Sequence, residues 1–144
     1  MPKPKVPNPD DILGLGYIIR PSGTCFDDVL DFITTHTRPE HYPLYRIVHG
    51  ICLIPTTDER FAHAWVERTL PGNHVTIIQG GIIDGYKVFF GVQPELFNER
   101  LRPQRCTRYT IPEAKHQNEI SNHFGPWDPE YDALARDRTS TSRR

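Results

Sequence analysis

Two β-rich segments joined by a short polar turn limit how this chain can fold. Residues 45–54 read YRIVHGICLI, residues 61–70 read FAHAWVERTL, and the PTTDER between them is rich in turn-forming residues. Successive side chains of a strand point to opposite faces, and apolar residues recur at alternate positions in both segments. Consecutive strands connected by a short turn pair antiparallel. The sequence therefore predicts an antiparallel hairpin at the centre of the fold.

The second of these strands differs between its two faces. One face carries large or polar side chains and the other carries small ones: Phe61, His63, Trp65 and Glu67 against Ala62, Ala64 and Val66. His63 is the residue of this strand whose side chain could take part in catalysis. A lone strand histidine is more often structural than catalytic, so its role depends on the groups that meet it.

More strands are expected after the hairpin. The turn LPGN at 70–73 leads into the apolar run HVTII at 74–78, and YKVFFGV at 86–92 is again β-rich. Gly80 and Gly81 are expected to interrupt the strand that begins at residue 74. Together these segments predict a meander of three to five antiparallel strands.

A helix is expected before the sheet. Thr24 can cap it, Asp27 and Asp28 place negative charge in its first turn, and apolar residues follow at helical spacing: Phe26, Val29, Leu30 and Ile33. Pro39 disfavours helical geometry in the residue before it. The helix should therefore end between residues 35 and 38.

The C-terminal part is expected to contain short helices. Residues 94–101 form one, and a second has Pro112 at its first position. Residues 103–110 are interpreted as the connection between them. Gly125 and Pro126 should end the second helix, and Trp127 is expected to pack back onto the body.

These elements predict an α+β fold, in which an N-terminal helix packs on an antiparallel β-sheet and short helices follow near the C-terminus. A chain of 144 residues fits a single domain, which we expect to span residues 12–135. Residues 1–11 contain four prolines and are expected to form a flexible arm. Residues 136–144 have the composition of a disordered tail.

Charge and cysteine content argue against several function classes. Seventeen basic and 18 acidic residues leave a net charge of -1, so no global field favours nucleic acid or an anionic membrane. The three cysteines, Cys25, Cys52 and Cys106, are widely spaced, which argues against a disulfide framework and for a reducing compartment. No signal-like segment is visible, and no stretch reaches the roughly 20 apolar residues of a membrane helix. We therefore expect a cytoplasmic protein with no membrane partner.

Three residues have the types and the order that thiol chemistry needs: Cys25, His63 and Asp84. Cys25 lies at the start of the predicted helix, where free backbone N–H groups and the helix dipole favour a thiolate or a developing oxyanion. Asp27 and Asp28 oppose this, because nearby negative charge raises the pKa of a thiol. In such a site Cys25 attacks an amide or ester, His63 acts as general base and then acid, and Asp84 orients the imidazole. Asp84 fits a turn equally well.

Two tryptophans are the candidate substrate-binding residues. Trp65 and Trp127 could line an acyl pocket or exclude water, and both also suit a hydrophobic core. The substrate would be a protein, a peptide or a small acyl compound. This chemistry requires no cofactor and no metal.

The order of a cysteine at a helix N-terminus, a histidine strand and an aspartate strand resembles the transglutaminase-like and papain-like cysteine hydrolase superfamily. The segments YRIVHGICLI, FAHAWVE and GGIID are similar to uncharacterised bacterial and phage proteins, and YTIPEAKHQNEISNHFGPWD resembles their C-terminal part. The resemblance covers roughly residues 25–128 and implies thiol-dependent acyl transfer or hydrolysis. Two features depart from the pattern. The insertion-like LPGNHVTIIQGG separates His63 from Asp84, and no glutamine or asparagine stands just before Cys25 to build an oxyanion hole.

The competing function class is a non-enzymatic accessory or interaction protein that retains this fold as a scaffold. The distance between the Cys25 sulfur and the His63 ring discriminates between the two classes, because proton transfer needs near hydrogen-bond reach.

Two further site types have weaker support. A metal site could draw on five residues, His49, Cys52, His63, His74 and His123, but His49 and Cys52 point to opposite faces of one strand and no second compact pair completes the set. Nucleic-acid binding could use a local basic run, Arg100, Arg102, Arg105 and Arg108, with Phe97 and Tyr109 stacking on bases. Such a run is usually a solvated face.

Overall fold

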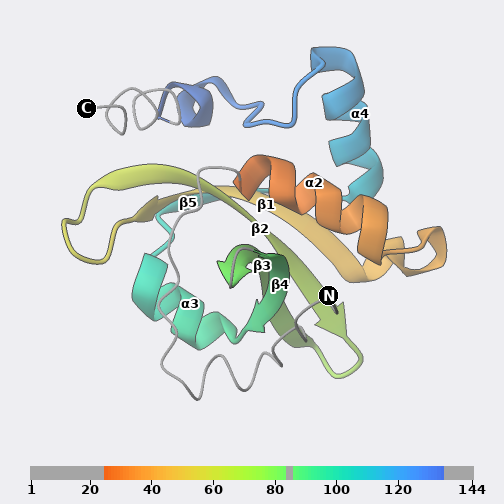
Figure 1. Cartoon of the computed structure of the whole chain (residues 1–144), viewed down its shortest axis with the longest axis horizontal. Coiled ribbons are helices and arrows are strands. Elements are labelled where there is room, and N and C mark those ends of the chain that lie inside the picture. The colour runs from red at the N-terminus through yellow and green to blue at the C-terminus, as the bar shows by residue number, and fades with distance from the viewer. Residues whose placement is uncertain (1–24, 84–85, 135–144) are drawn as a thin grey trace.

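The computed structural model describes residues 25–83 and 86–134 (Figure 1). The predicted arm at 1–11, the N-cap Thr24, the tail at 136–144 and Asp84 lie outside the described residues.

A five-stranded antiparallel sheet forms the centre of the fold. Its strands are β1 (Tyr45–Leu53), β2 (Arg60–Leu70), β3 (His74–Ile83), β4 (Tyr86–Val92) and β5 (Arg105–Tyr109), in the spatial order β4-β3-β2-β1-β5. The predicted hairpin is confirmed, because β2 pairs antiparallel with β1 over the whole length of β1, with Gly50 opposite His63. The first four strands form the predicted meander.

Helices lie on both faces of this sheet, as Figure 1 shows. Helix α2 (Cys25–His36) covers one face and α3 (Pro94–Leu101) covers the other, while α4 (Ile111–Ser121) lies beside α2 and β1. A short 3-10 helix, η1 (Pro39–Leu44), joins α2 to β1. The α+β prediction is confirmed, and the described part of the chain contains no helix that is long and apolar enough to cross a membrane.

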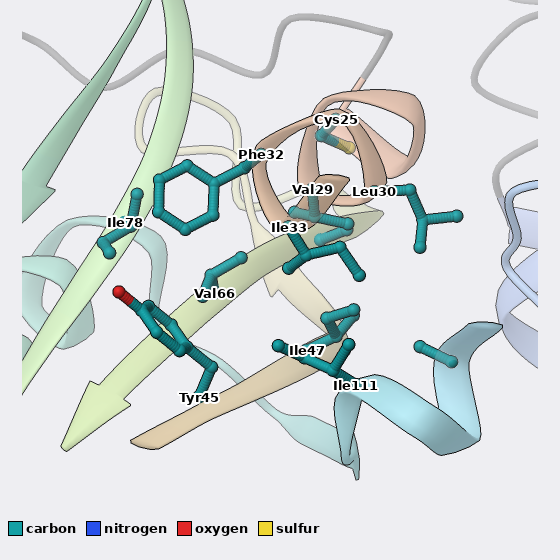
Figure 2. Close-up of a cluster of buried hydrophobic side chains, with 12 residues drawn as sticks. Cys25, Val29, Leu30, Phe32, Ile33, Tyr45, Ile47, Val66, Ile78 and Ile111 are labelled. Atoms are coloured by element: carbon teal, nitrogen blue, oxygen red, sulfur yellow. The ribbon is translucent and has the colours of Figure 1, made fainter. Parts of the chain in front are cut away.

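Alternation along the strands divides the core in two. The face covered by α3, called here the α3 face, buries large side chains that include Phe61, Trp65, Phe90 and Phe97. The face covered by α2, called the α2 face, buries Ala64 and Val66 of β2 against the apolar stripe of the helix (Figure 2). Small alanine side chains let the helix backbone come close to the strand, which explains why α2 packs on this side.

The structure corrects the prediction that glycines interrupt β3. The strand continues through Gly80 and Gly81, which pair with Phe89 and Val88 of β4. A Cβ at Gly80 would lie 2.9 Å from a carboxylate oxygen of Asp28, so glycine makes room for α2 at this point. The glycine serves close packing of a helix on the sheet.

The segment interpreted as a connection also contains a strand. β5 pairs with the outer edge of β1, so that Ile47 lies opposite Tyr109 and Gly50 opposite Cys106. Its sequence, RCTRY, carries little apolar signal because its residues are only partly buried or exposed. Backbone hydrogen bonds to β1 therefore define this strand, and its own periodicity does not reveal it.

Candidate functional site

Cys25 is the first residue of α2, and its side chain is buried. Figure 2 shows it at one end of the helix, beside the apolar side chains of the α2 face. Burial raises the pKa of its thiol to about 12, the backbone N–H of Ala64 opposes this rise, and the negative charge of Asp28 adds to it. The thiol is therefore protonated at neutral pH. Burial outweighs the helix N-terminus that was expected to favour a thiolate.

His63 is buried on the α3 face of β2. Its ring lies among the rings of Phe61, Trp65 and Phe97, at centroid distances of 5.6, 5.7 and 6.4 Å. Its Nε2 lies 2.6 Å from Oε1 of Gln79, and since a carbonyl oxygen can only accept, Nε2 carries the proton. Burial lowers the pKa of His63 to about 4, against smaller opposing effects of Gln79 and Asp28. The imidazole is therefore neutral and held in one tautomer.

The structure does not bring Cys25 and His63 together on one face. Cys25 packs with Ala64 on the α2 face, whereas the preceding residue His63 packs with α3 on the opposite face. The β2 backbone separates the two side chains. Asp84, the third predicted member, lies outside the described residues. The catalytic roles of these residues stay predictions.

Gln79 is the residue that orients His63, and the sequence interpretation missed it. It lies on β3, is buried, and faces the same side of the sheet as His63. The available signal was a single amide within the apolar run HVTIIQGG. A polar residue in a buried strand requires a hydrogen-bond partner, and His63 on the neighbouring strand β2 supplies one.

His49 is the histidine that shares the α2 face with Cys25. It pairs with Ala64 across β1 and β2, and its ring contacts Phe26, the neighbour of Cys25, at 4.7 Å. Trp127 and Tyr109 enclose it further, at 4.9 and 5.2 Å. Neither ring nitrogen has a hydrogen-bond partner among the described residues, and burial lowers the pKa of His49 to about 3. His49 is therefore a neutral core side chain in this arrangement.

The two tryptophans lie in different places. Trp65 is buried in the α3-face core, 4.7 Å from the ring of Phe97. Trp127 packs back onto the body, as predicted, where it contacts His49 on the α2 face, and its indole N–H donates to the His123 carbonyl at 3.0 Å. They lie on opposite faces of the sheet, and each packs against core side chains.

The geometry gives little support to the two other candidate sites, a metal site and a nucleic-acid-binding surface. Within the described ranges, no group of three or more histidine, cysteine, aspartate or glutamate side chains is arranged to hold a metal ion. Three of the four arginines in the basic run are paired with acids: Arg102 with Asp58, Arg105 with Asp128 and Glu130, and Arg108 with Glu67. These pairs neutralise much of the positive charge that nucleic-acid binding would need.

An open hollow of about 640 Å³ lies on the α2 face, toward the C-terminal end of the helix. We call it the Arg68 hollow. Side chains from α2, β1, β2 and β4 line it, among them Asp31, Phe32, His36, Tyr45, Arg68 and Phe89. It combines aromatic rings with both signs of charge, which is a composition that ligand sites share.

Comparison of the chain with protein-family models, with curated proteins and with solved structures finds no match.

Proposed function

We propose that this protein is a non-enzymatic binding protein and that its thiol and imidazole groups serve the core. One observation carries the proposal: consecutive residues of β2 contact α2 and α3, so that Cys25 and His63 lie on opposite faces of the sheet. Proton transfer between a thiol and an imidazole requires near hydrogen-bond reach. A strand backbone between the two groups prevents that contact.

The protonation states support the same proposal. A nucleophilic cysteine needs a lowered pKa or an adjacent base, and burial raises the pKa of Cys25 to about 12. His63 is neutral, but its Nε2 proton is committed to Gln79 and the residue is buried. Because the Cys25 thiol and the His63 ring lie on opposite faces of the sheet, one bound substrate could not contact both groups.

The exposed surface supports a binding function more directly than it supports catalysis. The Arg68 hollow is open, and its lining places the charged side chains of Asp31 and Arg68 beside aromatic rings at the margin of the α2-face core. We further propose a cytoplasmic location, which is consistent with the free state of all three cysteines.

Thiol labelling separates this proposal from a cysteine hydrolase. The folded protein is treated with iodoacetamide, and peptide mass spectrometry follows the order in which Cys25, Cys52 and Cys106 react. We expect the half-buried Cys106 to react first and Cys25 to stay unlabelled until the protein unfolds. Hydrolysis of an activated aryl ester should be equal in wild type, in Cys25→Ser and in the matched control Cys106→Ser.

The opposite result would overturn the proposal. Preferential labelling of Cys25, together with ester turnover that Cys25→Ser and His63→Gln both abolish while Cys106→Ser does not, would establish thiol catalysis.

A further inference from the structure

The Arg68 hollow holds one cation and one anion that do not pair with each other. Arg68 lies on β2 opposite Tyr45, and Asp31 lies on α2. Neither residue forms an ion pair with any described residue, although both line the same hollow. From this arrangement we infer that the hollow binds a small zwitterion that carries an ammonium group, a carboxylate group and an aromatic or apolar side chain. The inference rests on the proposed binding function and names its ligand class.

Arg68 is suited to the carboxylate of such a ligand. Its side chain is partly buried, and its Nε has no hydrogen-bond partner among the described residues. A buried N–H donor that stays unpaired costs free energy, so a ligand that accepts from it gains affinity. Guanidinium groups bind carboxylates through two parallel hydrogen bonds, which fixes the orientation of the bound group.

Asp31 is suited to the ammonium group. It lies on the exposed side of α2, where its backbone carbonyl accepts from Thr35 and its carboxylate forms no ion pair with a described residue. A ligand with only a carboxylate would satisfy Arg68 but would meet Asp31 as a like charge, and a simple amine would meet Arg68 in the same way. Only a ligand with both charges complements both residues.

Aromatic rings form the rest of the hollow. Phe89 contacts Phe32 at 5.3 Å and His36 at 5.2 Å, and Phe32 lies 6.0 Å from Tyr45. Figure 2 shows the Phe32 and Tyr45 rings at the same end of the core cluster. Their faces and edges offer apolar surface to a ligand side chain. The volume, about 640 Å³, lies within the range of roughly 300–1,000 Å³ typical of small-molecule sites, so it admits a free amino acid or a short peptide.

The test measures binding of four probes to the whole chain by isothermal titration calorimetry. L-Phenylalanine and the dipeptide phenylalanyl-phenylalanine carry both charges, 3-phenylpropionate lacks the ammonium group, and 2-phenylethylamine lacks the carboxylate. We expect the zwitterions to bind at least about tenfold more tightly than either single-charge analogue, since a hydrogen bond to a charged group contributes about 1.4 kcal/mol or more. The stronger of the two zwitterions distinguishes a free amino acid from a peptide.

Two variants assign the charges to their partners. Arg68→Gln should lower the affinity for phenylalanine about tenfold and leave that for 2-phenylethylamine unchanged or higher. Asp31→Asn should lower the affinity for phenylalanine by a similar factor and leave that for 3-phenylpropionate unchanged or higher. Arg60→Gln on the same strand and Asp27→Asn on the same helix are matched controls outside the hollow, and both should bind like wild type.

Three outcomes would overturn the inference: no binding of either zwitterion, equal affinity for zwitterions and single-charge analogues, or equal losses in the control variants. None of them would restore thiol chemistry, which the labelling of Cys25 decides separately.

Discussion

Acidification should destabilise this protein through His63, and the size of the effect follows from its burial. The pKa of His63 is lowered from 6.5 to about 4, chiefly because burial disfavours the charged ring. As the pH falls below 6.5 the unfolded chain takes up a proton that the folded protein does not. Folding stability is therefore full above pH 6.5, decreases as the pH falls, and levels off near the folded pKa. A pKa lowered by about 2.5, at ~1.4 kcal/mol for each pH unit, gives a loss of about 3 kcal/mol.

The assay compares wild type with His63→Gln. The amide of the new side chain keeps a hydrogen-bonding group next to Gln79, but it does not take up a proton in this pH range. Urea unfolding followed by circular dichroism gives the free energy of unfolding at several values between about pH 7 and pH 4. The variant should be less stable than wild type near neutral pH, and the difference should shrink by about 3 kcal/mol toward pH 4 because only wild type is destabilised by this proton.

A matched control uses His74→Gln, which makes the same change at an exposed histidine. Its stability should run parallel to that of wild type at every pH. Parallel curves for His63→Gln as well would refute the reasoning, since they would mean that the folded protein protonates His63 as readily as the unfolded chain does.

Three further predictions concern packing and helix capping. Gly80→Ala should lower the free energy of unfolding by about 1–3 kcal/mol, because the added Cβ overlaps Asp28 of α2, and an unchanged urea midpoint would contradict the close packing of α2 on β3. Trp65→Ala should cost about 3–5 kcal/mol, and Trp127→Ala should cost clearly less, because Trp65 is fully buried and Trp127 is not; thermal unfolding measures both. Thr110→Ala should cost about 1 kcal/mol, because it removes the side-chain oxygen that accepts from the Glu113 backbone N–H at the start of α4. Thr56→Ala is its control, because it makes the same change at an exposed turn position, and equal stability of Thr110→Ala and wild type would show that the cap contributes nothing.

Local patterns in the sequence determined most of the secondary structure. The alternation in residues 45–54 and 61–70 predicted β1 and β2 and their antiparallel pairing, and helical spacing with Pro39 predicted α2 and its end. These features are local, since each depends on side chains a few residues apart and on the turn between them. The same alternation also predicted that His63 and Ala64 face opposite sides of the sheet.

The side on which α2 packs was decided only by the tertiary structure. Alternation shows that β2 has two faces, but it does not show which face meets Cys25, because that depends on how closely a helix can approach. The alanine face admits α2, so His63 is left on the other side with α3. The presence of β5 and the continuity of β3 through Gly80 were likewise decided by partners distant in sequence.

The pairing of charges also depends on the tertiary structure. The positions of the arginines are known from the sequence, but their partners lie far along the chain, as in the pair of Arg108 with Glu67, 41 residues away. That pair and the other ion pairs neutralise much of the basic run. Arg68 on β2 and Asp31 on α2 line the same hollow, and neither forms an ion pair with a described residue. Composition fixes the number of charges, and only the packing of helix on sheet decides which of them stay unpaired, because pairing depends on distance in space.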